Sequence, residues 1–187
     1  MIKAVDLRRG TAVRYKDSVY VVTDSKHVAK GNKRSLMQVK LKNLSTGTII
    51  DERFRVSDSL EDVYVDKRQM EYSYSTGENH FCMDSQSYEQ VPLPLEVIGD
   101  GVGYLLSGTQ LEVHFFDGQP VTAILPNSVD LKVVEAPPVV KGATATNQYK
   151  IVKLETGIEV QVPPFIDTGE AVRIDTRSGQ YVERAKS

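Results

Sequence analysis

The sequence predicts an all-β protein assembled from small modules. Three observations support this prediction: apolar and polar residues alternate along most of the chain, Gly-containing turns separate the alternating segments, and one strand-turn-strand pattern occurs twice. Short strands at regular spacing with such turns are typical of small barrels or sandwiches.

Six segments carry the alternation. In chain order they are residues 11–24, 36–44, 48–56, 72–84, 111–125 and 171–185. We expect the first to turn at Lys16–Asp17. The other turn signals are STG at 45–47, STGEN at 75–79, DGQ at 117–119, ETG at 155–157 and RSGQ at 177–180. Helical periodicity is weak, and the best candidates are residues 2–7, 86–90 and 93–97.

An internal repeat indicates how the modules are arranged. The pattern G-x-x-L-x-V-x-x-x-D-G-Q-x-V begins at Gly108, and G-x-x-V-x-I-x-x-x-S-G-Q-x-V begins at Gly169. A fainter echo, GTAVRY, begins at Gly10. Equal register and equal turn chemistry indicate copies of one β module. The sequence therefore predicts three domains, at residues 1–63, 64–128 and 129–187.

Charge is distributed unevenly among these three predicted domains. Residues 1–63 contain 13 Lys and Arg against 8 Asp and Glu, whereas residues 64–128 contain 2 against 9, and residues 129–187 contain 8 against 8. A basic first domain favours a polyanionic partner, and phosphate is the usual polyanion in cells.

Composition argues against several classes of protein. Cys82 is the only cysteine, so no disulfide forms within the chain, and we expect it to be a small core residue in a reducing compartment. The first residues, MIKAVDLRRG, lack the apolar core of a signal peptide, and no apolar run is long enough to span a membrane. We expect a cytoplasmic protein with no membrane association.

Nothing in the sequence indicates an enzyme. His27, His80 and His114 are far apart, and the chain has no H-x-x-x-H or C-x-x-C spacing and no phosphate-binding glycine motif at a strand-to-helix junction. We expect no catalytic residue, no metal and no cofactor.

One hairpin gathers cations. Residues 27–44, HVAKGNKRSLMQVKLKNL, contain no acid, and Gly31–Asn32 suit a two-residue type I′ or II′ turn. Lys30, Lys33 and Arg34 flank this turn, where each can meet a phosphate.

Four stretches resemble bacterial translation elongation factor P in order and at family spacing. They are HVAKGNKRSLMQVKLKNLSTG (27–47), RQMEYSYSTGENHFCMDSQSYEQ (68–90), FDGQPVTAILPNSVDLKVVEAPPVVKGATA (116–145) and VPPFIDTGEAVRIDTRSGQYVERAK (162–186). The resemblance implies an N-terminal SH3-like (KOW-type) barrel followed by two OB-fold barrels in an L shape. It also implies a monomer that binds the ribosome (rRNA) and peptidyl-tRNA between the peptidyl and exit sites. There the factor promotes peptide-bond formation at stalls such as consecutive prolines.

This chain departs from the family at the loop tip. The modified lysine of many members aligns with Asn32, and Lys30 replaces the family's proline. Asn32 has neither amine nor guanidinium, so those modifications cannot occur there. Three alternatives remain: the loop works unmodified, a register shift moves a modification to Lys30, Lys33 or Arg34, or the loop has lost its role near the peptidyl-transferase centre.

Further RNA-contact candidates lie outside this loop. Lys40 and Lys42 make one strand face basic, and the net positive charge of residues 1–63 favours an rRNA contact there. Where many family members have a Gly/Thr-rich loop, this chain has GATATNQYK (142–150), in which Tyr149 can stack on a base. Tyr181 and Arg184 match the family's C-terminal Tyr and Arg. The alternative function is a non-ribosomal RNA-binding or adaptor protein built on the same barrels.

Overall fold

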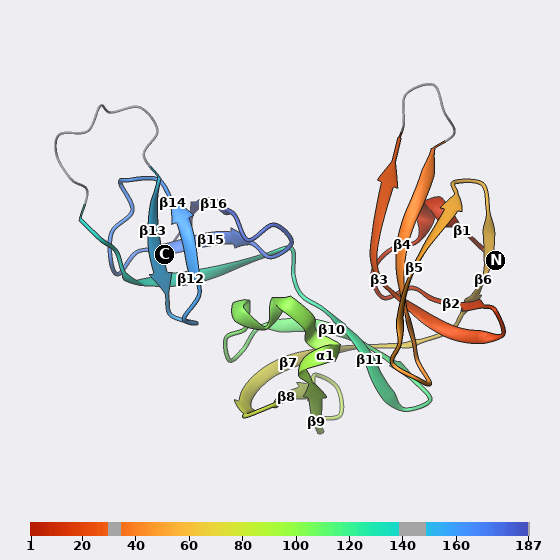
Figure 1. The fold of residues 1–187 in the computed structure, drawn as a ribbon. Helices are drawn as coiled ribbons and strands as arrows, with labels where there is room; N and C mark the ends of the chain where they lie inside the picture. Colours follow the sequence, from red (N-terminus) through yellow and green to blue (C-terminus); the bar gives the residue numbers. More distant parts are fainter. Residues whose placement is uncertain (30–34, 139–148, 187) are drawn as a thin grey trace. The chain divides into compact units, whose positions relative to one another are not determined.

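The computed structural model describes residues 1–29, 35–138 and 149–186 (Figure 1). Strands dominate and form three antiparallel sheets, so the all-β prediction is confirmed. The chain divides into two compact units. The first comprises Met1–Met70, Asp84–Ser87 and Glu112–Ile124, and the second comprises Glu71–Met83, Tyr88–Leu111 and Leu125–Ser187.

The first sheet has the strand order β1-β6-β2-β3-β4-β5. Its elements are β1 (Ile2–Lys3), the 3₁₀ turn η1 (Ala4–Asp6), β2 (Ala12–Tyr15), β3 (Ser18–Val28), β4 (Leu36–Asn43), β5 (Ile49–Arg55) and β6 (Ser59–Val63). Lys16 and Asp17 join β2 to β3 with φ of 47° and 62°, the two positive values that a type I′ turn requires. The predicted turn at these two residues is confirmed. Leu7, Val13, Val39 and Leu41 are fully buried in the core of this sheet.

The second sheet has the strand order β11-β10-β7-β8-β9. Its elements are β7 (Asp66–Thr76), β8 (Asn79–Asp84), β9 (Gln90–Pro94), the helices α1 (Leu95–Ile98) and η2 (Gly99–Tyr104), β10 (Gln110–Phe116) and β11 (Gln119–Ile124). Cys82 is fully buried in β8, and burial raises the pKa of its thiol to about 12. The prediction that Cys82 is a core residue is confirmed.

The third sheet has the strand order β14-β13-β12-β15-β16. Its strands are β12 (Ser128–Glu135), β13 (Lys150–Leu154), β14 (Glu159–Val162), β15 (Ala171–Asp175) and β16 (Tyr181–Arg184). Its core contains Leu131, Val152, Leu154, Ile166 and Ile174. Small domains bury a limited fraction of their surface, so each of these aliphatic side chains is a large share of what stabilises the sheet.

The sequence repeat is a repeat of backbone geometry. Gly108 and Gly169 both have φ of 92°, and each donates its N–H over 2.8 Å to a strand carbonyl, that of Tyr72 and of Val133 respectively. Gly10 has φ of 88° and makes the equivalent 2.8 Å bond to Val22. Because only glycine enters this conformation without strain, the three glycines mark the same turn before a sheet strand. Gly10, where the fainter echo GTAVRY begins, thus shares the turn geometry of the two clear copies.

Two of the three predicted helical segments overlap short helices, and the third does not. Residues 2–7 contain η1, and residues 93–97 overlap α1. The expected helix at 86–90 is wrong: the chain forms a turn there, Tyr88 has φ of 60°, and β9 begins at Gln90. Asp84 explains the turn, because its Oδ1 accepts the backbone N–H groups of Gln86 and Ser87 at 2.8 and 3.1 Å. This local bonding competes with a helix.

Within the described ranges, no helix is long enough and apolar enough to cross a membrane.

Candidate nucleic-acid interface

The predicted loop sits at the end of the longest hairpin of the first sheet. Residues Lys30, Gly31, Asn32, Lys33 and Arg34 lie outside the described residues, so the predicted turn at Gly31–Asn32 stays a prediction. The flanking strands β3 and β4 pair in an antiparallel ladder whose last described pair is Val28 with Leu36. Asn32 is the middle residue of the segment that joins this pair.

Alternation gives the hairpin two chemically different faces. Residues directly opposite each other in the ladder share a face. Lys26 pairs with Gln38, which pairs with Arg53, so these three form one row of the exposed outer face. His27 pairs with Met37, which pairs with the buried Phe54, so this row lies on the inner face. Neighbouring residues of one strand therefore serve opposite sides of the sheet.

The predicted contacts Lys40 and Lys42 both lie on the outer face of β4. Lys40 is exposed, but its cross-strand neighbours are Asp24 on β3 and Asp51 on β5. Two carboxylates beside one ammonium reduce the positive potential that a phosphate would meet. Lys42 is half-buried and lies opposite Val21 and Ile49. The structure thus places both lysines on the expected face, where Lys40 lies between two aspartates.

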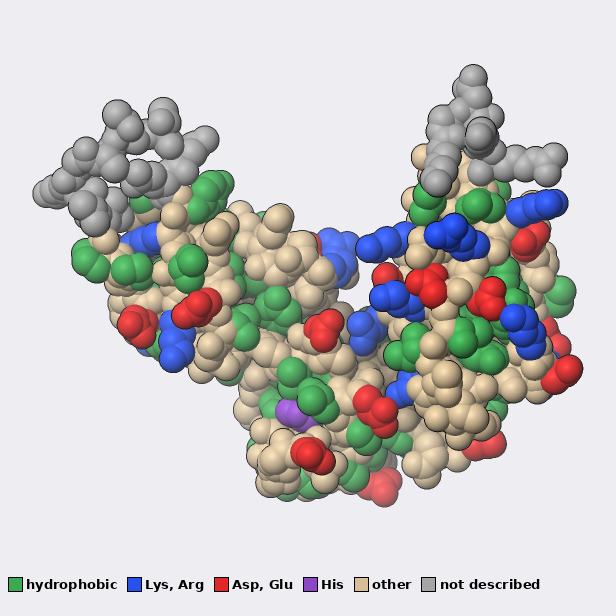
Figure 2. Space-filling model, in the orientation of Figure 1, with side chains coloured by type: hydrophobic (Ala, Val, Ile, Leu, Met, Phe, Trp, Pro, Cys, Tyr) green, Lys and Arg blue, Asp and Glu red, His purple; other side chains and the backbone are tan. Residues whose placement is uncertain are grey.

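Three other cations on this face were not among the predicted RNA contacts. Lys26, Arg53 and Arg55 are exposed, occupy the rows nearer the loop, and form no ion pair with any described residue. The signal that could have found them is the period-2 spacing of Arg53 and Arg55 in TIIDERFRV. Figure 2 shows several Lys and Arg side chains over β3, β4 and β5, with Asp and Glu side chains between them. This cationic face, Lys26, Arg53 and Arg55, continues the basic character of the predicted loop along the strands.

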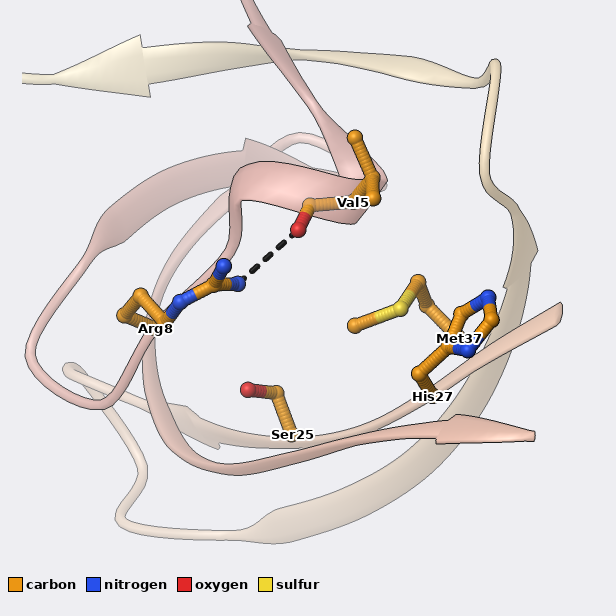
Figure 3. A pocket seen from close by; sticks show the side chains of 5 residues that line it. All are labelled: Val5, Arg8, Ser25, His27 and Met37. Carbon is orange, nitrogen blue, oxygen red and sulfur yellow. Dashed lines mark hydrogen bonds between the residues drawn. The ribbon is translucent and has the colours of Figure 1, made fainter.

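The inner face borders a cavity of about 280 Å³ lined by Val5, Arg8, Ser25, His27 and Met37. Figure 3 shows the five side chains around one opening, with Arg8 and His27 on opposite sides. The turn that follows η1 brings Arg8 to the sheet, where Arg8 Nη1 donates to the carbonyl oxygens of Val5 and Leu7 at 2.8 and 2.9 Å. These bonds fix the guanidinium at the rim of the cavity.

The C-terminal candidates lie in different environments. Tyr149 is 63 % exposed, whereas Tyr181 is half-buried against the core of the third sheet, and burial raises the pKa of its phenol. Two contacts with Phe165 hold Arg184 in place. Its Nη2 donates to the Phe165 carbonyl oxygen at 3.0 Å, and its guanidinium lies 4.8 Å from the centre of the Phe165 ring. Its Nε is also 3.1 Å from Glu170. Tyr181 and Arg184 therefore contribute to packing, and their RNA contacts stay predictions.

The described residues offer no group of three or more His, Cys, Asp or Glu side chains close enough to hold a metal ion.

Three models of known protein families match this chain, one after another along its length. The family models that match are the elongation factor P KOW-like domain at residues 3–60, the elongation factor P OB domain at 65–123 and the elongation factor P C-terminal domain at 129–184. The chain belongs to the elongation factor P family.

Relatives in this family match over their full length. Elongation factor P of Moorella thermoacetica is 42 % identical over 185 residues, which cover 99 % of this chain and 100 % of the relative. That of Carboxydothermus hydrogenoformans is 40 % identical over 184 residues, covering 98 % and 100 %. That of Acidobacterium capsulatum is 41 % identical, covering 98 % and 99 %. Members of the elongation factor P family are translation factors, and the predicted KOW-like and OB folds are confirmed by the matching models.

Proposed function

We propose that this chain binds the ribosome between the peptidyl and exit sites and positions peptidyl-tRNA for peptide-bond formation at stalls such as consecutive prolines. The observation that carries the proposal is the ordered match of three elongation factor P domains from residue 3 to residue 184. We further propose that it works as a cytoplasmic monomer with domains at 1–63, 64–128 and 129–187.

The proposed action needs no covalent chemistry. Holding a reactant in the geometry of attack lowers the entropic part of a barrier, which is work that side-chain contacts alone can do. The hairpin β3–β4 would carry the loop, and its exposed cationic face would meet phosphates along the way. Lys30, Lys33 and Arg34 would anchor the tip, while Asn32 would hydrogen-bond through its amide to a ribose 2′-OH or a phosphate.

Asn32 makes an unmodified loop the first choice among the three alternatives. An amide cannot carry the amine-borne or guanidine-borne extensions of other family members. The intact mass of the protein from its native host tests this directly. A mass equal to that of the bare chain removes the alternative in which Lys30, Lys33 or Arg34 is modified.

The function is tested by translation of a polyproline reporter in a system lacking its own factor. We expect the wild-type protein to raise reporter synthesis and to co-sediment with ribosomes. Ribosome binding without rescue would contradict the proposed role and favour the adaptor alternative.

A matched pair of variants locates the contact. We expect Lys30→Glu, Lys33→Glu and Arg34→Glu together to abolish rescue and weaken ribosome binding. The control, Lys3→Glu, Lys67→Glu and Lys153→Glu, makes the same change in net charge at three exposed positions. Equal loss in both variants would show that net charge, rather than the loop, drives binding.

A further inference from the structure

The cavity beneath the hairpin offers hydrogen-bonding groups that the fold leaves unused. Arg8 donates from Nη1 to the carbonyl oxygens of Val5 and Leu7, while its Nε and Nη2 have no partner among the described residues. A guanidinium that is fixed through one nitrogen and open at two others presents a preoriented fork to an anion.

Ser25 and His27 add complementary polar groups to the same cavity. The Ser25 hydroxyl donates to the Leu7 carbonyl oxygen at 3.0 Å, so its oxygen can only accept further bonds. His27 is exposed, and its ring makes no hydrogen bond to a described residue. The cavity therefore provides an acceptor at Ser25, donors at Arg8 and a flat ring at His27.

The remaining wall is apolar. Met37 is 3 % exposed and forms part of the sheet core, and Val5 is 38 % exposed on the opposite segment. A polarizable thioether packs well against the face of a flat ring. With about 280 Å³ of space, the cavity lies near the lower end of the range for small-ligand pockets, so it suits a single planar base that carries a phosphate on its ribose.

We propose that this cavity binds one unstacked ribonucleotide, with the base against Met37 and His27 and the phosphate on the free nitrogens of Arg8. Proteins that bind single-stranded RNA take up splayed bases in this way, on aromatic, His or Arg planes with hydrogen bonds to the base edges. That the nucleotide belongs to RNA rests on the proposed ribosomal function. The cavity itself is tested without the ribosome.

The test follows the Met37 methyl group by NMR. The full chain contains four Met, so methyl-labelled protein gives Met37 with Met1, Met70 and Met83 as internal references. The probe is adenosine 5′-monophosphate, compared with inorganic phosphate and with adenosine. We expect the monophosphate to shift the Met37 methyl signal saturably, with a dissociation constant on the order of 1 mM. Inorganic phosphate and adenosine should each bind at least about 5-fold more weakly. No Met37 shift, or an equal effect of phosphate alone, would overturn the proposal.

Two residues on opposite faces of the hairpin supply the matched variants. His27→Ala removes the flat ring from the cavity, whereas Gln38→Ala changes the outer face of the neighbouring strand β4. We expect His27→Ala to weaken monophosphate binding at least about 5-fold and Gln38→Ala to leave it unchanged. A dispersed amide spectrum for the first sheet, together with unshifted Met70 and Met83 signals from the second sheet, establishes that each variant is folded. Equal affinity in His27→Ala and wild type would overturn the proposal.

The reporter assay separates this inference from the proposed function. Rescue of the polyproline reporter without any nucleotide effect at Met37 would overturn the cavity proposal alone. A saturable Met37 shift that His27→Ala abolishes would support the cavity proposal even in a protein that fails to rescue translation.

Discussion

The imidazole of His114 lies against Gly10, with Nδ1 3.0 Å from the Gly10 carbonyl oxygen. A carbonyl only accepts, so Nδ1 carries a hydrogen and donates it to Gly10. The other ring nitrogen, Nε2, is 2.6 Å from Glu112 Oε1, and the ring is almost completely buried. Residues 104 positions apart are thus joined in one compact unit by a side chain that leaves no room at Gly10.

We expect Gly10→Ala to lower the free energy of unfolding by about 2–4 kcal/mol. The added Cβ would lie 2.8 Å from His114 Cε1 and Nδ1, and φ at this position is +88°. The control is Gly157→Ala, where φ is +91° and nothing lies within 4 Å of the added atom. Urea unfolding should show a loss of about 1–2 kcal/mol for the control. Equal losses would mean that His114 yields freely and that the contact adds nothing.

Cys82 should be inert in the folded protein. Burial raises the pKa of its thiol to about 12, so at pH 8 on the order of one molecule in 10⁴ carries the reactive thiolate. We expect no reaction with a disulfide reagent at pH 8 over the time in which the urea-unfolded chain reacts fully. Ser57→Cys supplies a matched exposed thiol, which should react in the folded protein. Rapid labelling of Cys82 in wild type would contradict its assignment to the core.

Asp175 should make stability depend on pH in the acid range. Its pKa is lowered to about 2, first by the hydrogen bond from the Arg177 side chain and then by backbone N–H groups of Arg177 and Ser178. A carboxylate with a depressed folded-state pKa stabilises the fold above its unfolded value of about 3.9, and this contribution is lost as pH falls toward 2.

The comparison of wild type with Asp175→Asn measures that contribution. We expect Tm to be lower in the variant between pH 5 and 7, and the difference to shrink steadily between about pH 4 and pH 2. A difference in Tm that stays constant across this range would show that the substitution acts through the shape of the turn and not through charge.

Local patterns predicted those parts of the fold that local chemistry decides. The positive φ of Lys16, Asp17 and the repeated glycines follows from turn geometry, which the sequence displays directly. The expected helix at 86–90 failed because the Asp84 carboxylate bonds the backbone of the next residues. Periodicity cannot detect such competition.

Features that depend on distant partners were not predictable from alternation. Val21 and Val22 are successive residues of β3, and both are fully buried. Val22 belongs to the core of the first sheet, and β11 contacts β3 from about a hundred residues away. Cross-strand register places Asp24 and Asp51 beside Lys40, and alternation alone does not predict the register. The cavity likewise exists because the turn after η1 places Arg8 beside Ser25 and His27.

Cross-strand register divides the exposed cations of β3, β4 and β5 into two groups. Lys26, Arg53 and Arg55 have no acid among their cross-strand partners, whereas Lys40 lies between Asp24 and Asp51. Phosphate contacts release counterions, so each lost contact lowers the salt dependence of binding by roughly one unit of log–log slope. We expect the triple variant Lys26→Ala, Arg53→Ala and Arg55→Ala to weaken ribosome binding and to lower the slope by up to about three units.

The control is Lys40→Ala, measured by sedimentation across a series of salt concentrations. Its effect on the slope should be well below one unit, because the two aspartates already offset its charge. A slope unchanged in the triple variant would show that the cationic face does not contact phosphate. A full unit lost in Lys40→Ala would show that RNA displaces the carboxylates from Lys40, and the cross-strand register would then be a poor guide to which cations bind.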